Sequence, residues 1–87
     1  MSEAVSAKIK EYVMDEFLPG EDPGELTATT PLITGGILDS IAALKLVMFL
    51  EEEYGVTFEP HEVSRENLDT IARITQLLIS KKPILTR

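Results

Sequence analysis

The chain has 87 residues, of which 44% are hydrophobic and 26% charged, and it contains no cysteine. This length allows a single domain with one small core, residues 1–87, and the lack of cysteine excludes disulfides and thiolate metal sites. The net charge of −7 excludes nucleic-acid binding through a basic face and favours partners with basic surfaces. Acidity also serves solubility, so the charge alone does not identify a partner.

Neither a membrane span nor a signal peptide is visible in the chain. The longest apolar run, residues 41–50, is interrupted by Lys45 and is too short to cross a bilayer. The first three residues lack the basic start and apolar run of a signal peptide. We therefore expect a soluble, cytoplasmic protein without membrane partners.

The first predicted element is a helix from about Glu3 to Leu18, with Ser2 as its cap. Pro19-Gly20 ends this helix, because proline cannot continue it. Its apolar residues recur at helical spacing, on a face that we expect to be buried. This face consists of Val5, Ile9, Tyr12, Val13 and Phe17.

A connection of about twenty residues follows, which is long for a compact domain. It carries large aliphatic residues, which a disordered linker usually lacks. These are Leu26, Leu32, Ile33 and Ile37. We expect an ordered loop that packs over the helices.

A second helix is predicted from Asp39 to about Tyr54, with Gly55 just past its end. Its apolar residues exceed what one buried stripe needs. One set, Leu46, Val47, Phe49 and Leu50, supplies a core face. A second set, Ile41, Leu44 and Met48, forms a line at i, i+3 and i+7 toward the opposite side. If this line is exposed, we expect it to be a docking surface. The alternative is that the helix is buried on all sides.

The remaining elements are short. Val56-Thr57-Phe58 is predicted as an extended link whose apolar residues plug the core, and Ser64 as the cap of one helical turn over residues 65–67. Asp69-Thr70 then caps a last helix to about Lys82, whose C-terminal dipole Lys81 and Lys82 would complement. Its inward face is predicted to be Ile71, Ile74, Leu77 and Leu78. The fold class is therefore all-α, a bundle of three main helices, one short helix and one long loop.

Three acids, Glu51–Glu53, end the second helix, where the helix dipole is itself negative. Local stability does not explain them. They form either a solvated face or a patch for basic partners.

The segment Gly35–Ile41 is the most informative part of the chain. Two glycines allow a tight turn into the second helix, and Asp39 is a favoured N-cap. Ser40 then stands at the mouth of the helix, beside an N-terminus that favours negative charge. This position suits a serine that carries a phosphate-linked group. The alternative is an ordinary helix start, since this pattern is common there.

Catalytic and metal-binding patterns are missing. His61 is the only histidine, and one histidine without cysteine does not make a zinc site. Ser40 lacks the G-x-S-x-G elbow of hydrolases, and neither a P-loop nor an EF-hand pattern occurs. A Ser40–His61 hydrolase remains a remote alternative, because so small a bundle offers little cleft. We predict no catalytic residue, no metal site and no enzymatic activity.

Four segments resemble the acyl carrier protein and peptidyl carrier protein superfamily, and the resemblance extends over nearly the whole chain. Gly36-Ile37-Leu38-Asp39-Ser40-Ile41 resembles the attachment signature of these carriers. The other segments are Thr30-Pro31-Leu32 in the loop, Leu50–Val56 at the end of the second helix and Glu66–Ile71 at the start of the last one. The resemblance implies a four-helix carrier bundle that acts as a discrete protein.

The resemblance also implies a function. Ser40 would receive a covalent 4′-phosphopantetheine arm from coenzyme A through a phosphopantetheinyl transferase, whose recognition Asp39 assists. The thiol of the arm would hold acyl or aminoacyl groups as thioesters. Loading enzymes (adenylation or acyltransferase) and downstream synthase or tailoring enzymes would be the partners of a monomeric shuttle. We assign to the partner surface Ile41, Leu44, Lys45, Met48, Glu51 and Glu52.

The second helix departs from that of fatty-acid carriers, whose outer face is strongly acidic. Here Ala42, Ala43 and Lys45 occupy the matching positions, and the acids come later. This favours a carrier of polyketide or nonribosomal peptide biosynthesis over a housekeeping fatty-acid carrier. An interaction module without a prosthetic group is the alternative from another class of protein.

Overall fold

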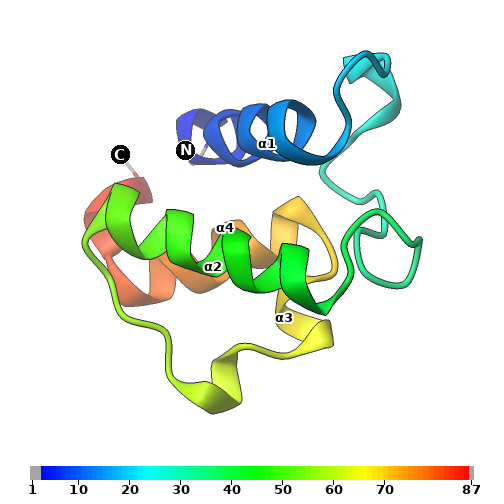
Figure 1. The fold of residues 1–87 in the computed structure, drawn as a ribbon. Coiled ribbons are helices and arrows are strands. Elements are labelled where there is room, and N and C mark those ends of the chain that lie inside the picture. Colours follow the sequence, from blue (N-terminus) through cyan, green and yellow to red (C-terminus); the bar gives the residue numbers. More distant parts are fainter. Residues whose placement is uncertain (1–2, 87) are drawn as a thin grey trace.

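A computed structural model describes residues 3–86, and these form four α-helices with three short 3₁₀ turns and no strand (Figure 1). The helices are α1 (Glu3–Phe17), α2 (Ser40–Tyr54), α3 (Arg65–Leu68) and α4 (Ile71–Lys81). The 3₁₀ turns are η1 (Pro23–Glu25), η2 (Pro60–Glu62) and η3 (Pro83–Thr86). The predicted all-α class and the division into three main helices and a short one are confirmed. The predicted cap Ser2 lies outside the described residues.

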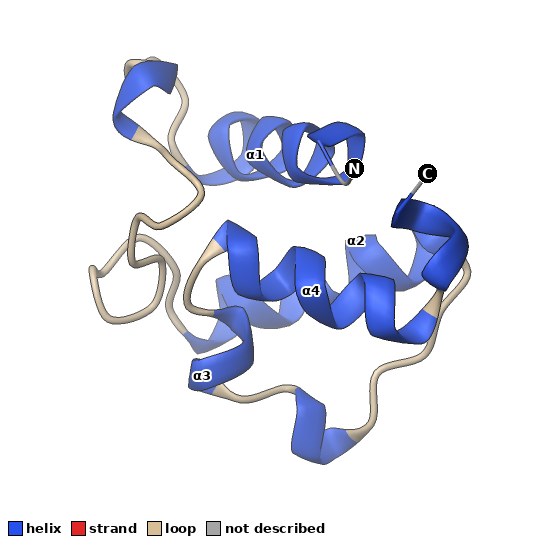
Figure 2. Ribbon diagram, turned by 180° about the vertical axis from the view of Figure 1, so that it is seen from behind, coloured by secondary structure: helices blue, strands red, loops and turns tan. Residues whose placement is uncertain are grey.

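The three main helices bury one shared core. α2 lies nearest the viewer in Figure 1, and α4 lies nearest the viewer in Figure 2. In both views α1 lies above these two helices. The predicted inward faces are confirmed by the buried residues Val5, Ile9 and Val13 of α1, Leu46, Val47 and Leu50 of α2, and Ile71, Ile74 and Leu78 of α4. Four residues predicted on these faces are only partly buried: Tyr12, Phe17, Phe49 and Leu77. Thr75 of α4 is buried instead, and its hydroxyl lies 3.0 Å from that of Ser6, within hydrogen-bonding distance.

Both ends of α2 follow from the sequence. Asp39 is the N-cap, and its Oδ1 accepts the backbone N–H of Ala42 at 2.8 Å. At the other end Gly55 adopts a left-handed conformation, with φ of 65°, and donates its N–H to the carbonyl of Glu51. The Asp39 cap fixes where α2 begins, and thereby the position of Ser40, whereas Gly55 fixes where the helix ends.

The long loop between α1 and α2 is ordered, as predicted. Its side chains Leu26, Leu32 and Leu38 are buried in the core. Its backbone is tied to the start of α4, because Ala28 accepts the N–H of Ala72 at 3.0 Å. The segment that leads to Ser40 is therefore part of the folded body.

The link from α2 to α3 is fixed by charged side chains. Glu51 accepts the backbone N–H of Phe58 at 2.9 Å, and the Phe58 ring is buried. Lys81 lies 5.4 Å above that ring and pairs with Glu62 at 2.6 Å. This hydrogen-bonded Lys81 ammonium, followed by the backbone N–H of Glu59, lowers the pKa of Glu62 below its ordinary value.

Two expectations about charged residues need correction here. The terminal acids are not only a solvated face or a partner patch, because two of them contact other segments of the fold: Glu51 accepts the N–H of Phe58, and Glu53 lies 3.6 Å from Lys8. The lysines that end α4 serve other elements than their own helix. Lys82 donates to the carbonyl of Tyr54, the last residue of α2, at 2.7 Å, because the chain folds these two helix ends together.

Candidate functional site

Ser40 is the first residue of α2, and it is exposed. Leu38, two residues before Ser40, is buried, and Asp39 caps the helix, so both residues hold the backbone on the N-terminal side of Ser40. The N–H dipoles of the first turn of α2 point toward this end of the helix, where they favour an anion. The site therefore combines an accessible hydroxyl with an environment suited to a phosphate group.

The turn before Ser40 needs both of its glycines, for different reasons. Gly36 has a φ of 82°, which residues with a side chain rarely adopt. Gly35 has no such φ, but a Cβ at this position would overlap the carbonyl oxygen of Pro31. The sequence predicted conformational freedom at both positions, and at Gly35 the actual requirement is close packing.

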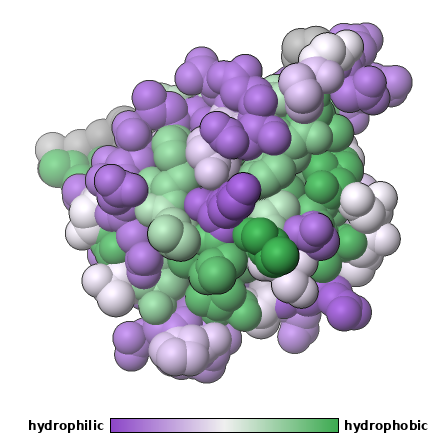
Figure 3. All heavy atoms as spheres, viewed as in Figure 1, coloured by the Kyte–Doolittle hydropathy of each residue, from purple (hydrophilic) through white to green (hydrophobic). Residues whose placement is uncertain are grey.

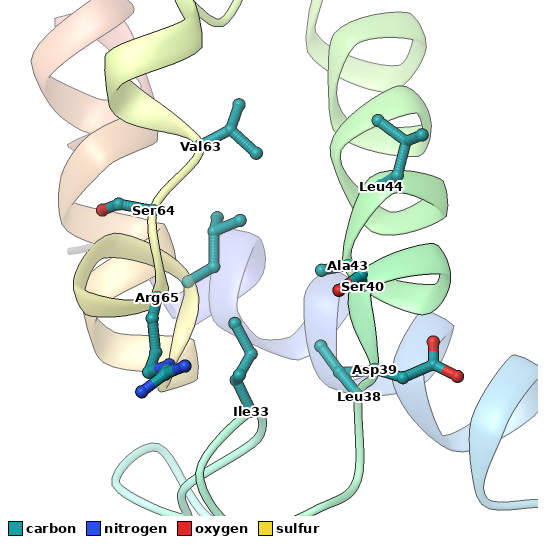
Figure 4. Close-up of a pocket in the computed structure, with 10 residues that line it drawn as sticks. Ile33, Leu38, Asp39, Ser40, Ala43, Leu44, Val63, Ser64 and Arg65 are labelled. Carbon is teal, nitrogen blue, oxygen red and sulfur yellow. The ribbon is translucent and has the colours of Figure 1, made fainter.

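A cavity of about 590 Å³ opens beside Ser40 (Figure 4). Ser40 and Leu44 line it from α2, and Val63 and Arg65 line it from the opposite side, at the start of α3. The lining is largely aliphatic, and Arg65 is its one cation. An apolar group attached near Ser40 would find an apolar wall within reach.

The line of apolar residues on α2 is exposed, as one of the two sequence readings predicted. Ile41 is 68% exposed, Leu44 54% and Met48 56%. Viewed from the side of α2, apolar side chains gather over the middle of this face, among hydrophilic ones (Figure 3). An exposed apolar line of this kind is a candidate surface for contact with partners.

A shallow groove continues this surface toward α1. It has a volume of about 290 Å³ and lies between Tyr12 of α1 and Lys45, Met48, Phe49 and Glu52 of α2. The rings of Tyr12 and Phe49 stack at 4.1 Å, and burial, followed by the charge of Glu16, raises the pKa of the Tyr12 phenol. The sequence analysis placed both aromatic residues only in the core, because periodicity does not show which ring reaches the surface.

The predicted partner residues thus divide into two groups. Lys45 and Glu52 are exposed at the groove, next to Met48. Glu51 is half-buried, and one oxygen of its carboxylate accepts the N–H of Phe58. A role of Glu51 in partner binding remains a prediction.

The sequence did not predict the role of Asp69. This residue was expected to cap the last helix together with Thr70, but Thr70 alone caps α4, by accepting the N–H of Arg73 at 3.1 Å. The carboxylate of Asp69 instead binds the loop before Ser40, at Ile33 and Thr34. No local pattern indicates this contact, because its partners lie about 35 residues away in the chain.

The other chemistry considered from the sequence finds no geometric support. His61 lies exposed in η2 and does not line the cavity at Ser40. Among the residues that the structure describes, no three His, Asp or Glu side chains gather closely enough to hold a metal ion. No helix in the described part of the chain has the length and apolarity needed to span a membrane.

An exposed serine at the mouth of the second helix of a small four-helix bundle is the arrangement of a carrier domain. A family model described as phosphopantetheine attachment site matches residues 9–78 of the chain. The chain therefore belongs to the phosphopantetheine-attachment family and is a carrier protein. The resemblance seen in its sequence is confirmed.

Curated relatives agree with this assignment. The chain is 32% identical over 74 residues to a probable acyl carrier protein, PigG, of a Serratia species, a match that covers 85% of this chain and 84% of PigG. It is 32% identical over 76 residues to the D-alanyl carrier protein of Lactococcus lactis, covering 85% and 96%. It is 43% identical over 56 residues to the lincomycin biosynthesis protein LmbN of Streptomyces lincolnensis, a match that spans 64% of this chain but only 20% of LmbN.

Proposed function

We propose that Ser40 is the residue to which 4′-phosphopantetheine is attached. The observation that carries this proposal is the exposure of Ser40 as the first residue of α2, within a chain of the phosphopantetheine-attachment family. Ser64 also precedes a helix, but its hydroxyl accepts the N–H of Asn67 as the cap of α3, which has only four residues. Ser40 is therefore the better candidate.

The residues around Ser40 fit such an arm. In the transfer, a bond would form between Ser40 Oγ and the phosphorus of the arm as the phosphoanhydride of coenzyme A breaks. Adenosine 3′,5′-bisphosphate would leave, and the hydroxyl proton of Ser40 would pass to a base of the transferase. No general base is needed in the carrier, which agrees with the absence of a histidine beside Ser40. The N-terminus of α2 stabilises the negative charge of the phosphodiester. When attached, the arm supplies the thiol that this cysteine-free chain lacks.

Asp39 has two proposed roles at the site. Its Oδ1 caps α2 through Ala42, which fixes the backbone at Ser40. As an exposed carboxylate next to Ser40, it is also available to the transferase for recognition. The first role depends on an acceptor oxygen, whereas the second also depends on charge.

We further propose that the protein is a substrate of its partner enzymes and performs no catalysis itself. Its partners are a phosphopantetheinyl transferase, an enzyme that loads the thiol, and enzymes that modify or accept the cargo. Tethering raises the effective concentration of the cargo at each of these enzymes. The exposed line Ile41, Leu44 and Met48, with Lys45 and Glu52 beside it, is the proposed docking surface.

The cargo is proposed to be an acyl or aminoacyl thioester of polyketide or nonribosomal peptide biosynthesis. Similarity to a protein named for lincomycin biosynthesis and to a probable acyl carrier supports a biosynthetic role, and similarity to D-alanyl carrier proteins supports an aminoacyl cargo. Ala42 and Ala43, which were expected from the sequence on the outer face of α2, are buried in the core. The alternative of a fatty-acid carrier is less well supported, because the exposed residues of this part of α2 are Ile41, Leu44, Lys45 and Met48 rather than acids. We also propose that this single domain acts as a cytoplasmic monomer.

Incubation with a phosphopantetheinyl transferase and coenzyme A tests the attachment site. Intact-mass spectrometry is expected to find one arm on the wild-type protein and on Ser64→Ala, and none on Ser40→Ala. A wild-type protein that several competent transferases leave unmodified would overturn the proposal. So would an arm on Ser40→Ala.

A further inference from the structure

We propose that Asp69, on the turn between α3 and α4, is a positioning residue for the attachment of the arm, because it clamps the loop that presents Ser40. This inference rests on the proposed attachment at Ser40. Asp69 lies 29 positions after Ser40 in the sequence and does not line the cavity beside it. Its effect on Ser40 must therefore pass through the loop.

The clamp consists of four hydrogen bonds to three consecutive loop residues. Oδ1 of Asp69 accepts the backbone N–H groups of Ile33 and Thr34, both at 2.9 Å. Oδ2 accepts the hydroxyl of Thr34, also at 2.9 Å. The backbone carbonyl of Asp69 accepts the N–H of Leu32 at 2.6 Å. Asp69 thus accepts the backbone N–H groups of three successive loop residues. These residues lie outside helices and strands, so their N–H groups have no partner within regular secondary structure.

A second layer of hydrogen bonds carries this restraint to Ser40. The carbonyl of Leu32 accepts the N–H groups of Ile37 and Leu38, both at 2.8 Å, and the carbonyl of Ile33 accepts that of Gly36 at 3.1 Å. Leu38 is buried, and the next residues are the N-cap and Ser40. The backbone that Asp69 holds is therefore the one on which the turn before Ser40 is built.

The hydrogen bonds from the loop favour the ionised form of the Asp69 carboxyl. The N–H of Thr34, then its hydroxyl and the N–H of Ile33, lower the pKa of the Asp69 carboxyl, and the nearby Arg65 adds to the effect. A carboxylate that accepts three hydrogen bonds is stabilised in its ionised form. An amide in its place would still offer one oxygen to the two backbone N–H groups.

The test compares three variants as substrates of one transferase with coenzyme A, each at a temperature where circular dichroism shows it folded. Asp69→Ala is expected to lower kcat/KM for the carrier by about 10-fold or more, since misplacing a reacting group has effects of this size. Asp69→Asn is expected to stay within about threefold of the wild type, because its Oδ1 can accept the same two N–H groups. Thr70→Ala is the matched control, as it removes the cap of α4 one residue away but leaves the loop bonds in place.

Thr34→Val supplies a milder variant that keeps the test decisive if Asp69→Ala does not fold. It removes only the hydroxyl donor to Asp69, and a loss of kcat/KM smaller than for Asp69→Ala but larger than for Thr70→Ala is expected. Hydrogen exchange provides a second readout: the amides of Ile37 and Leu38 should lose protection in Asp69→Ala and keep it in Thr70→Ala.

The outcomes separate this inference from the attachment itself. If Asp69→Ala is modified as efficiently as the wild type, or if Thr70→Ala loses as much activity as Asp69→Ala, the positioning role is wrong while attachment at Ser40 stands. If the wild type is not modified, the attachment proposal fails first.

Discussion

Substitution by alanine should strongly destabilise the protein at one leucine of α2 and barely affect its stability at another leucine two positions away. Leu46 is fully buried in the shared core, whereas Leu44 is 54% exposed in the docking line. Leu46→Ala removes buried methyl groups and leaves a cavity, which costs about 2–5 kcal/mol of the free energy of unfolding. Leu44→Ala removes mostly hydrated surface, and a change within about 0.5 kcal/mol is expected.

These values translate into clear differences in thermal stability. For a domain of this size each kcal/mol corresponds to about 4–8 °C in Tm, so Leu46→Ala should melt at least about 8 °C lower than the wild type. The total stability expected of such a domain is only about 4–13 kcal/mol, so Leu46→Ala approaches the limit of folding. Urea denaturation followed by circular dichroism measures both variants. Equal destabilisation by the two substitutions would refute the assignment of one face of α2 to the core and the other to partners.

Three further predictions concern the turn, the cap and the response to acid. Gly35→Ala should cost about 1–3 kcal/mol in urea denaturation, because its Cβ would overlap the Pro31 carbonyl; an unchanged midpoint would contradict this. Asp39→Ala should lose about 1 kcal/mol and slow the transferase, whereas Asp39→Asn should keep the cap and lose only rate. Lys81 lowers the folded-state pKa of Glu62 below the ordinary value of 4.5. The ion pair therefore stabilises the folded protein above pH 4.5, and this stabilisation is lost as the pH falls through the folded-state pKa of Glu62. Thermal melts from about pH 7 to about pH 3 should therefore decline less steeply for Glu62→Gln, and parallel declines would contradict the ion pair.

The sequence predicts the helices well because their determinants are local. α2 begins one residue after the predicted cap and ends at the predicted Tyr54, since a carboxylate cap and a left-handed glycine act within a few residues. The exposure of Ser40 and of the line Ile41, Leu44 and Met48 follows from the same local geometry, once periodicity has assigned the other face to the core.

The contacts that the sequence does not predict are those between distant segments. Asp69 is a favoured helix-capping residue, and nothing nearby shows that its carboxylate turns to a loop about 35 residues earlier. Lys81 follows the usual pattern for a helix C-terminus, yet it pairs with Glu62 of another segment. In both cases a polar side chain satisfies groups that are brought near it only by the packing of the helices. The contacts of Asp69 and Lys81 could therefore not be predicted from the sequence, whereas the position of Ser40 at the start of α2 could.

The proposed function depends on attachment of the prosthetic arm at Ser40. Peptide mapping by mass spectrometry of the protein isolated from its native cells tests it most directly, because the same spectrum locates the arm and weighs its cargo. We expect a phosphopantetheine adduct on the peptide that contains Ser40, with an acyl or aminoacyl group on its thiol in the loaded fraction. An arm on another serine, or a fully active protein whose Ser40 is unmodified, would contradict it.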